Sequence, residues 1–265
     1  MRINKPYLKY LNRILIVIFS VIALLLTVNS SEELERQEFH KKNFVNLRIS
    51  TSYFSCVEEI EETSEEVDLS LSGCIDQGIL YESTASGLSI KTVNGKTYTL
   101  TAAHFCEVFR SDLSSLGYLS SDMEITDSLG NNYDSEIVYL DRSSDLCLVS
   151  SFAPIEDDIQ LAKDIPEVGE KIFALSSPLS MSGDGVLLHF EGFFSGCNSD
   201  KICFYTIPAT SGSSGSIVFN NDGEAIGMIQ MVPIGFDSVS IGIGRDSIEN
   251  FLSSASEALS IDLSI

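Results

Sequence analysis

The chain has 265 residues, of which 44% are apolar and 20% charged, and its formal net charge is −22. One domain of ordinary size with flanking segments accounts for this length. The charge excludes nucleic acid as a partner, because phosphate binding needs a basic surface, which the chain lacks outside its first residues.

The N-terminus has the pattern of a targeting segment. Its basic flank contains Arg2, Lys5, Lys9 and Arg13. An uncharged apolar run follows over residues 14–28, shorter than the ~20 residues of a comfortable membrane-spanning helix. Residues 1–30 are therefore predicted to be either a signal peptide or an uncleaved signal anchor that holds the protein at a membrane. In both cases the rest of the chain is expected to be exported.

Residues 31–75 are predicted to form a helical stalk followed by an acidic linker. Ser30 and Ser31 are suitable N-caps for the stalk helix. Seven acidic residues crowd positions 58–68, and no basic residue occurs between Arg48 and Lys91. Such a run is typical of a solvated segment, and a propeptide, a calcium site or a docking arm stay as alternatives.

From residue 76 onward, short β-rich segments alternate with turn residues. Asn94 and Gly95 between two alternating runs are a strong hairpin signal, and Asn-Asp-Gly at 221–223 indicates a second turn. Strands at this spacing predict an all-β, antiparallel barrel or sandwich. Only residues 246–259 have a helical pattern, with Asp246 as the expected N-cap.

The six cysteines form an even set in a chain that is predicted to be exported, so disulfides are expected. They are Cys56, Cys74, Cys106, Cys147, Cys197 and Cys203. Cys197 and Cys203 bracket a short loop and are the best local pair, whereas Cys147 lies in an apolar run that suits an inert buried thiol equally well. No Cys/His spacing indicates zinc, and neither a metal nor a cofactor is predicted.

A glycine- and serine-rich turn at 212–216 has the sequence Gly-Ser-Ser-Gly-Ser. A nucleophilic serine needs a tight turn that projects its hydroxyl and aims backbone N–H groups at the developing oxyanion. Ser214 is the candidate nucleophile, and the N–H groups of Gly212 and Ser214 are the candidate oxyanion hole.

A histidine and an aspartate stand where they could activate this serine. His104 follows an apolar run that ends in two alanines, so its imidazole can reach across as a base. Asp145 precedes an apolar run and can orient that imidazole, with Asp141 as the fallback. The other histidines, His40 and His189, suit structural roles better.

These three segments, in the order His, Asp, Ser, resemble the trypsin-like serine proteases of the chymotrypsin superfamily. The resemblance covers about residues 76–255 and favours the bacterial and viral glutamyl-endopeptidase or HtrA-like branch without a PDZ domain. It implies two six-stranded antiparallel β-barrels within a protease domain at 76–258, followed by a tail at 259–265. It also implies a serine endopeptidase that works through an acyl-enzyme intermediate.

The same resemblance implies how a protein or peptide substrate is bound. The strand that pairs with extended substrate would contain Gln230, Met231 and Val232. The specificity pocket would be lined by Pro208, Ala209 and Thr210, opposite Ser240 and Gly242. No acid stands at its base, so a small or medium uncharged P1 residue is expected, and an acidic P1 with His189 or Thr210 as partner stays open. The alternative function is a catalytically inactive relative that binds peptides or scaffolds an envelope assembly.

Overall fold

The computed structural model describes residues 18–19, 22, 41–56, 74–107, 118–155 and 158–265. The predicted acidic run, and all but three residues of the targeting segment and stalk up to residue 40, lie outside the described residues. No helix within the described part of the chain is long and apolar enough to cross a membrane. The segment His40–Ile265 groups into one compact unit.

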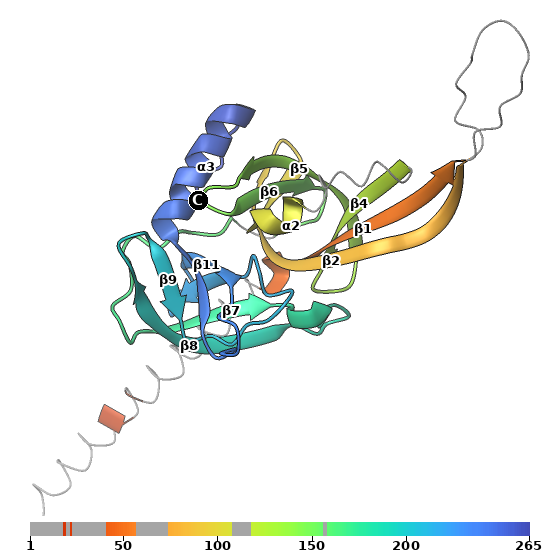
Figure 1. Cartoon of the computed structure of the whole chain (residues 1–265). Helices are drawn as coiled ribbons and strands as arrows, with labels where there is room; N and C mark the ends of the chain where they lie inside the picture. The colour runs from red at the N-terminus through yellow and green to blue at the C-terminus, as the bar shows by residue number, and fades with distance from the viewer. Residues whose placement is uncertain (1–17, 20–21, 23–40, 57–73, 108–117, 156–157) are drawn as a thin grey trace, which may run out of the picture. The chain divides into compact units, whose positions relative to one another are not determined.

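Six antiparallel strands close into a first barrel in the order β1-β2-β3-β6-β5-β4 (Figure 1). The strands are β1 (Phe44–Cys56), β2 (Cys74–Val93), β3 (Lys96–Ala102), β4 (Tyr118–Asp127), β5 (Asn132–Asp141) and β6 (Leu146–Ser151). A short helix, α2 (Ala103–Glu107), follows β3 directly. Side chains that alternate along these strands fill the barrel, as the period of two in a β-strand requires.

The first barrel begins at Phe44, well before the boundary at residue 76 that the sequence indicated. Val45, Leu47 and Ile49 alternate along β1 and are buried. Arg48, on the opposite face of the strand, binds acidic residues of β2 and β4. The charges around this strand obscure its alternation. The sequence therefore predicted a stalk and linker where β1 lies.

A second closed barrel has the order β10-β11-β12-β9-β8-β7. Its strands are β7 (Lys171–Ser176), β8 (Leu188–Cys197), β9 (Ile202–Tyr205), β10 (Ile217–Asn220), β11 (Ala225–Met231) and β12 (Ser240–Gly244), with a 3-10 turn, η2 (Pro178–Ser180), after β7. Tyr205 is fully buried in its core and donates a hydrogen bond to the Ile243 carbonyl at 2.7 Å. The predicted fold of two six-stranded antiparallel barrels is confirmed.

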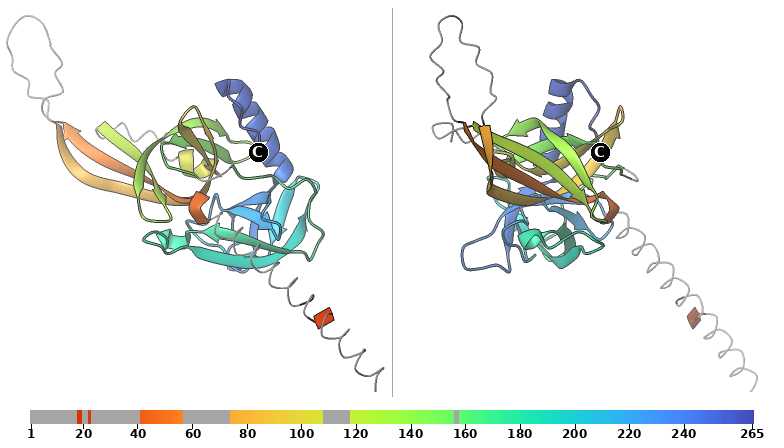
Figure 2. Two further views of the ribbon diagram at one scale, coloured as in Figure 1. Left: turned by 180° about the vertical axis from the view of Figure 1, so that it is seen from behind. Right: turned by 90° about the vertical axis from the view of Figure 1, so that its right-hand side faces the viewer.

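The predicted hairpin at Asn94 and Gly95 is confirmed. Both residues have positive φ, +52° and +80°, and they join β2 to β3 with Val93 opposite Lys96. β2 is a single strand of 20 residues, longer than the short β-rich segments that the sequence predicted. Figure 2 shows how far β1 and β2 run together as a long curved ribbon.

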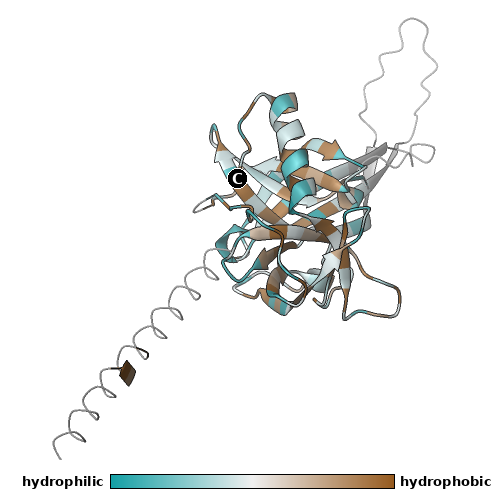
Figure 3. Cartoon of the chain, turned by 90° about the vertical axis from the view of Figure 1, so that its left-hand side faces the viewer, coloured by the Kyte–Doolittle hydropathy of each residue, from teal (hydrophilic) through white to brown (hydrophobic). Residues whose placement is uncertain are grey.

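The C-terminal helix α3 (Arg245–Leu259) is confirmed, but its predicted N-cap is wrong. Gly244 occupies the cap position and Asp246 lies in the first turn. The helix buries an apolar stripe, and its Phe251 ring contacts Tyr139 of β5 with centroids 5.3 Å apart. In Figure 3 much of this helix is coloured teal or white, in keeping with its many charged and serine residues. Because α3 follows β12, it ties the second barrel to the first.

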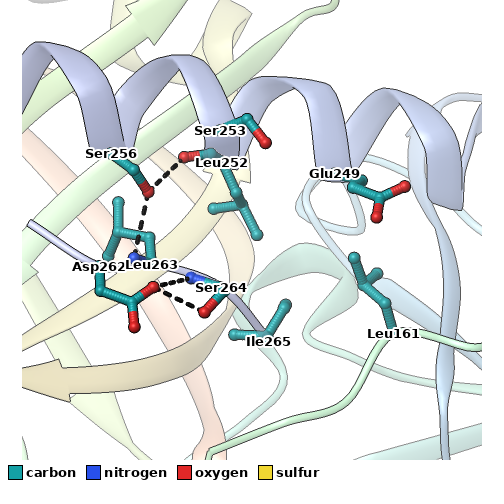
Figure 4. Close-up of a pocket in the computed structure, with 9 residues that line it drawn as sticks. All are labelled: Leu161, Glu249, Leu252, Ser253, Ser256, Asp262, Leu263, Ser264 and Ile265. Atoms are coloured by element: carbon teal, nitrogen blue, oxygen red, sulfur yellow. Dashed lines mark hydrogen bonds between the residues drawn. The ribbon is translucent and has the colours of Figure 1, made fainter.

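A cavity of about 360 Å³ lies between α3 and the C-terminal residues (Figure 4). Leu161, Leu252 and Ile265 are among its apolar lining. Leu263 is buried beside it, and its N–H donates to the Ser256 hydroxyl at 3.1 Å. None of the predicted site residues lines this cavity, so it is separate from the candidate active site.

Candidate active site

His104 is positioned by the end of β3. The last residue of that strand, Ala102, lies opposite Leu146, the first residue of β6. The Ala103 N–H donates to the carbonyl of Asp145 at 3.1 Å. The pairing of β3 with β6 therefore brings His104 beside Asp145, although 41 residues separate them in the chain.

The imidazole of His104 is hydrogen-bonded to the Asp145 carboxylate. Nδ1 lies 2.8 Å from Oδ2 and 3.1 Å from Oδ1, and the His104 backbone N–H donates to Oδ1 at 2.8 Å. This hydrogen bond raises the pKa of His104 above its ordinary value, against the lowering effect of burial. The charges of Asp145 and Glu107 add to the increase.

The turn before β6 presents Asp145 in a left-handed conformation, with φ of +53°. Such a conformation is unfavourable for a residue other than glycine and has to be held by its surroundings. Asp141, the fallback aspartate, accepts hydrogen bonds from the N–H and hydroxyl of Ser143 and the hydroxyl of Ser144. The structure thus uses Asp141 to shape the turn that presents Asp145.

Gln230 links this turn to the second barrel. Its side-chain nitrogen donates to the carbonyls of Ser144 at 2.6 Å and Asp145 at 3.1 Å. The residue is only 7% exposed. The sequence indicated Gln230 for its main chain alone, and its side-chain role was missed because a contact across two barrels leaves no local pattern.

Ser214 lies in a turn between two glycines with positive φ, Gly212 at +89° and Gly215 at +88°. Ser86 of β2 holds this turn from the first barrel. Its hydroxyl donates to the Gly212 carbonyl at 2.8 Å, and its N–H donates to the Ser214 carbonyl at 2.9 Å. Sequence reasoning missed Ser86, which carries no motif.

The candidate oxyanion donors are uncommitted. The hydrogen bonds formed by the described backbone use neither the N–H of Gly212 nor that of Ser214. The Ser214 hydroxyl donates to the Gln230 carbonyl at 3.1 Å. Among the described residues, no hydrogen bond joins Ser214 to His104.

Gly215 brings the serine turn against the strand that carries His104. A Cβ added at Gly215 would clash with the Ser86 carbonyl and lie 2.5 Å from the Thr101 hydroxyl and 3.2 Å from the Ala102 nitrogen. Thr101 and Ala102 are the last residues of β3. The two barrels therefore approach each other so closely at residue 215 that only glycine fits there.

We expect Gly215→Ala to destabilise the protein by about 2–4 kcal/mol, because it combines overpacking with an unfavourable φ. Gly95→Ala is the matched control, since Gly95 also has positive φ but has nothing within 4 Å of its Cβ position. The control should lose only about 1 kcal/mol. Urea denaturation of both variants measures the difference, and equal losses would contradict the close approach.

The residues predicted for substrate binding differ in exposure. Pro208, Thr210 and Met231 are exposed, Val232 is partly buried, and Ala209 is buried. Ser240 is fully buried and its hydroxyl has no hydrogen-bond partner among the described residues.

His189, the alternative partner for an acidic P1 residue, packs against an aromatic ring of the second barrel. Its ring stacks on Phe173 with centroids 5.1 Å apart. Burial lowers the pKa of the imidazole, which disfavours the charged form, although the charge of Glu191 opposes this. Within the described residues, no group of three His, Cys, Asp or Glu side chains is arranged to hold a metal ion.

A family model described as a trypsin-like peptidase domain matches residues 85–228. The match includes just over half of the chain and contains His104, Asp145 and Ser214. The chain belongs to the trypsin-like peptidase family. The prediction of a trypsin-like serine protease is confirmed at this level, and its assignment to the glutamyl-endopeptidase or HtrA-like branch stays a prediction. No curated protein sequence matches the chain.

Solved structures of serine proteases share the fold of this trypsin-like peptidase. The serine endoprotease from Yersinia pestis is 15% identical with a TM-score of 0.59, covering 85% of this chain and 66% of that one. The active form of the Rv3671c protease from M. tuberculosis is 12% identical with a TM-score of 0.56, covering 82% of each chain. An inactive serine-to-alanine mutant of Rv3671c gives 10% identity and a TM-score of 0.56, covering 84% of this chain and 90% of that one.

Proposed function

We propose that this trypsin-like peptidase is a serine endopeptidase that hydrolyses peptide bonds through an acyl-enzyme intermediate, with His104, Asp145 and Ser214 as its triad. The observation that carries the proposal is the hydrogen-bonded His104–Asp145 pair at the junction of the barrels where the Ser214 turn packs. The uncommitted N–H groups of Gly212 and Ser214 supply the oxyanion donors.

In the proposed reaction the Ser214 hydroxyl attacks the scissile carbonyl and passes its proton to Nε2 of His104. Asp145 accepts the hydrogen bond from Nδ1–H, which fixes the tautomer and stabilises the imidazolium. The oxyanion accepts hydrogen bonds from the N–H groups of Gly212 and Ser214. His104 then protonates the leaving amine, and a water molecule, deprotonated by His104, hydrolyses the acyl-enzyme to release the acid and regenerate Ser214.

The Ser214 hydroxyl has to leave the Gln230 carbonyl to reach His104. We expect rotation about the Cα–Cβ bond of Ser214 to accomplish this, and rotamer exchange is fast compared with enzymatic turnover. Catalytic hydrogen bonds are often incomplete before substrate binds. The same Ser214–Gln230 hydrogen bond is what favours the alternative, a catalytically inactive peptide-binding or envelope scaffold protein.

The substrate surface suits uncharged, extended peptide. Met231, at the end of β11, is 55% exposed, and Ile234 and Phe236 in the following loop are also exposed. Because the net charge is −22, an acidic substrate is opposed at long range. We therefore propose that the end of β11 and the residue after it bind substrate main chain through Gln230, Met231 and Val232. An uncharged P1 residue would then face Pro208, Ala209 and Thr210.

We also propose that the protease works outside the cytoplasm, with residues 1–30 as signal peptide or anchor. Two disulfides support this, Cys106–Cys147 and Cys197–Cys203, because such bonds persist in oxidising compartments. The second of these is the local pair that the sequence predicted.

Activity should fall as the pH falls through the raised pKa of His104. The imidazole acts as base only when neutral, so the acid limb of kcat/KM is expected above pH 6.5, the ordinary histidine value. The stability that the imidazolium–carboxylate pair contributes depends on pH in the opposite direction to activity. It is present at low pH and is lost as the pH rises through this pKa. The pH profile of kcat/KM with a peptide substrate measures the acid limb. A midpoint of that limb below pH 6.5 would contradict the His104–Asp145 hydrogen bond.

The proposed function is tested by incubating the full-length protein with an unfolded polypeptide and identifying new termini by mass spectrometry. Wild type should produce internal cleavages and Ser214→Ala none. The inactive alternative predicts that wild type and Ser214→Ala both bind a fluorescent peptide, measured by anisotropy, and that neither cleaves it.

A further inference from the structure

A disulfide joins the two elements that carry His104 and Asp145. Cys106 lies two residues after His104 on α2, and Cys147 lies two residues after Asp145 on β6. Their sulfurs are bonded, with the Cα atoms 6.6 Å apart. The disulfide and the His104–Asp145 hydrogen bond therefore close a small ring that contains only residues 104–106 and 145–147.

The helix at this ring depends on its surroundings for its stability. α2 has five residues, which is too short for an independently stable helix. Besides the hydrogen bond between the His104 imidazole and the Asp145 carboxylate, the N–H groups of Ala103 and His104 donate hydrogen bonds to Asp145. At its other end Glu107 forms an exposed ion pair with Arg142. Among the described residues, the disulfide is the covalent tie between the helix and β6.

The disulfide lies in the core of the first barrel. Cys106 is 1% exposed and Cys147 is not exposed at all, and both belong to the buried apolar cluster that includes Phe105 and Val149. Dissolved reductants do not reach such a bond in the folded protein, so its placement fits a permanent support better than a redox switch. On the β6 side it anchors the strand directly after the left-handed Asp145.

We propose that the Cys106–Cys147 disulfide positions the His104–Asp145 pair for catalysis, which makes Cys106 and Cys147 positioning residues. The inference rests on the proposed function. The disulfide adds a covalent limit to the separation of the imidazole and the carboxylate, next to the pairing of β3 with β6. Preorganisation of this kind matters because a misplacement of about 1 Å can lower the rate ~10²-fold.

The test replaces both cysteines, as Cys106→Ala/Cys147→Ala in the full-length chain. The matched control is Cys197→Ala/Cys203→Ala, which removes a disulfide of the same chemistry from the β8–β9 hairpin of the second barrel. We expect the first variant to lose about 100-fold in kcat with little change in KM, and the control to keep its kcat. If the alanine variant does not fold, Cys106→Val/Cys147→Ala restores apolar volume and is measured instead.

Two further readouts separate positioning from general stability. The acid limb of kcat/KM should move to lower pH in the first variant, because the Asp145 hydrogen bond that raises the pKa of His104 is loosened while Glu107 and Arg142 are unchanged. The downfield NMR signal of the His104 Nδ1 proton, measured without substrate, should broaden or disappear in the first variant and persist in the control.

A lower melting temperature with unchanged kcat, acid limb and NMR signal would overturn the inference, because the disulfide would then serve stability alone. Failure of the proposed function gives a different result. In that case wild type cleaves no peptide, whereas the NMR signal still depends on the Cys106–Cys147 bond.

Discussion

Ser214→Ala is expected to lower kcat by about 10⁶-fold, which is the typical cost of removing the nucleophile of a serine protease. The loss is this large because Ser214 forms the proposed acyl-enzyme, and Ser213 and Ser216 beside it are buried. His104→Ala should cost about as much, and the double variant no more than either, since a nucleophile and its base act as a unit. Steady-state kinetics with one peptide substrate measures all three.

A neighbouring serine, Ser216, provides the control. Ser216→Ala removes a buried hydroxyl that has no hydrogen-bond partner among the described residues, two positions from Ser214. It should leave kcat within a small factor of wild type. Additive losses in the Ser214 and His104 variants would show that the two side chains do not cooperate and would contradict the triad.

Asp145→Asn is expected to lower kcat by about 10⁴-fold while the protein stays folded. An amide at this position presents an N–H group to Nδ1, which favours the tautomer with the proton on Nε2. That tautomer cannot accept the proton of Ser214. The acid limb should also move to lower pH, because the carboxylate that raises the pKa of His104 is lost.

Asp141→Asn is the matched control for this prediction, since it makes the same chemical change four residues earlier. Its amide oxygen can still accept the hydrogen bonds from the N–H and hydroxyl of Ser143, and its amide nitrogen can donate to the Ser144 hydroxyl in place of the lost Oδ2 acceptor. The turn should therefore survive with a loss within about tenfold. A larger loss from Asp141→Asn than from Asp145→Asn would reassign the orienting aspartate.

Much of the fold could be predicted from local sequence patterns. The Asn94-Gly95 turn and the C-terminal helix were predictable because each depends on neighbouring residues: positive φ in a two-residue turn, and helical periodicity. The start of the first barrel was not predictable in this way. β1 alternates correctly, but its outward Arg48 is neutralised by Glu82 and Glu124, which lie far away in the sequence.

The candidate site also contains features that could be predicted from the sequence and features that could not. The motifs around His104, Asp145 and Ser214 were visible because each lies next to small residues or an apolar strand. The supporting contacts of Ser86 and Gln230 were invisible, since both act across the junction of the two barrels. The Cys106–Cys147 bond also escaped prediction, because six cysteines allow fifteen complete pairings and spacing favours only the local one.

The most direct test of the central claim is labelling of the full-length protein with a fluorophosphonate probe, followed by mapping of the adduct by mass spectrometry. We predict an adduct on Ser214 in wild type and in Ser216→Ala, no adduct in Ser214→Ala, and strongly slowed labelling in His104→Ala. A folded wild-type protein that stays unlabelled, or a Ser214→Ala variant that labels as fast as wild type, would contradict the assignment of Ser214 as the nucleophile.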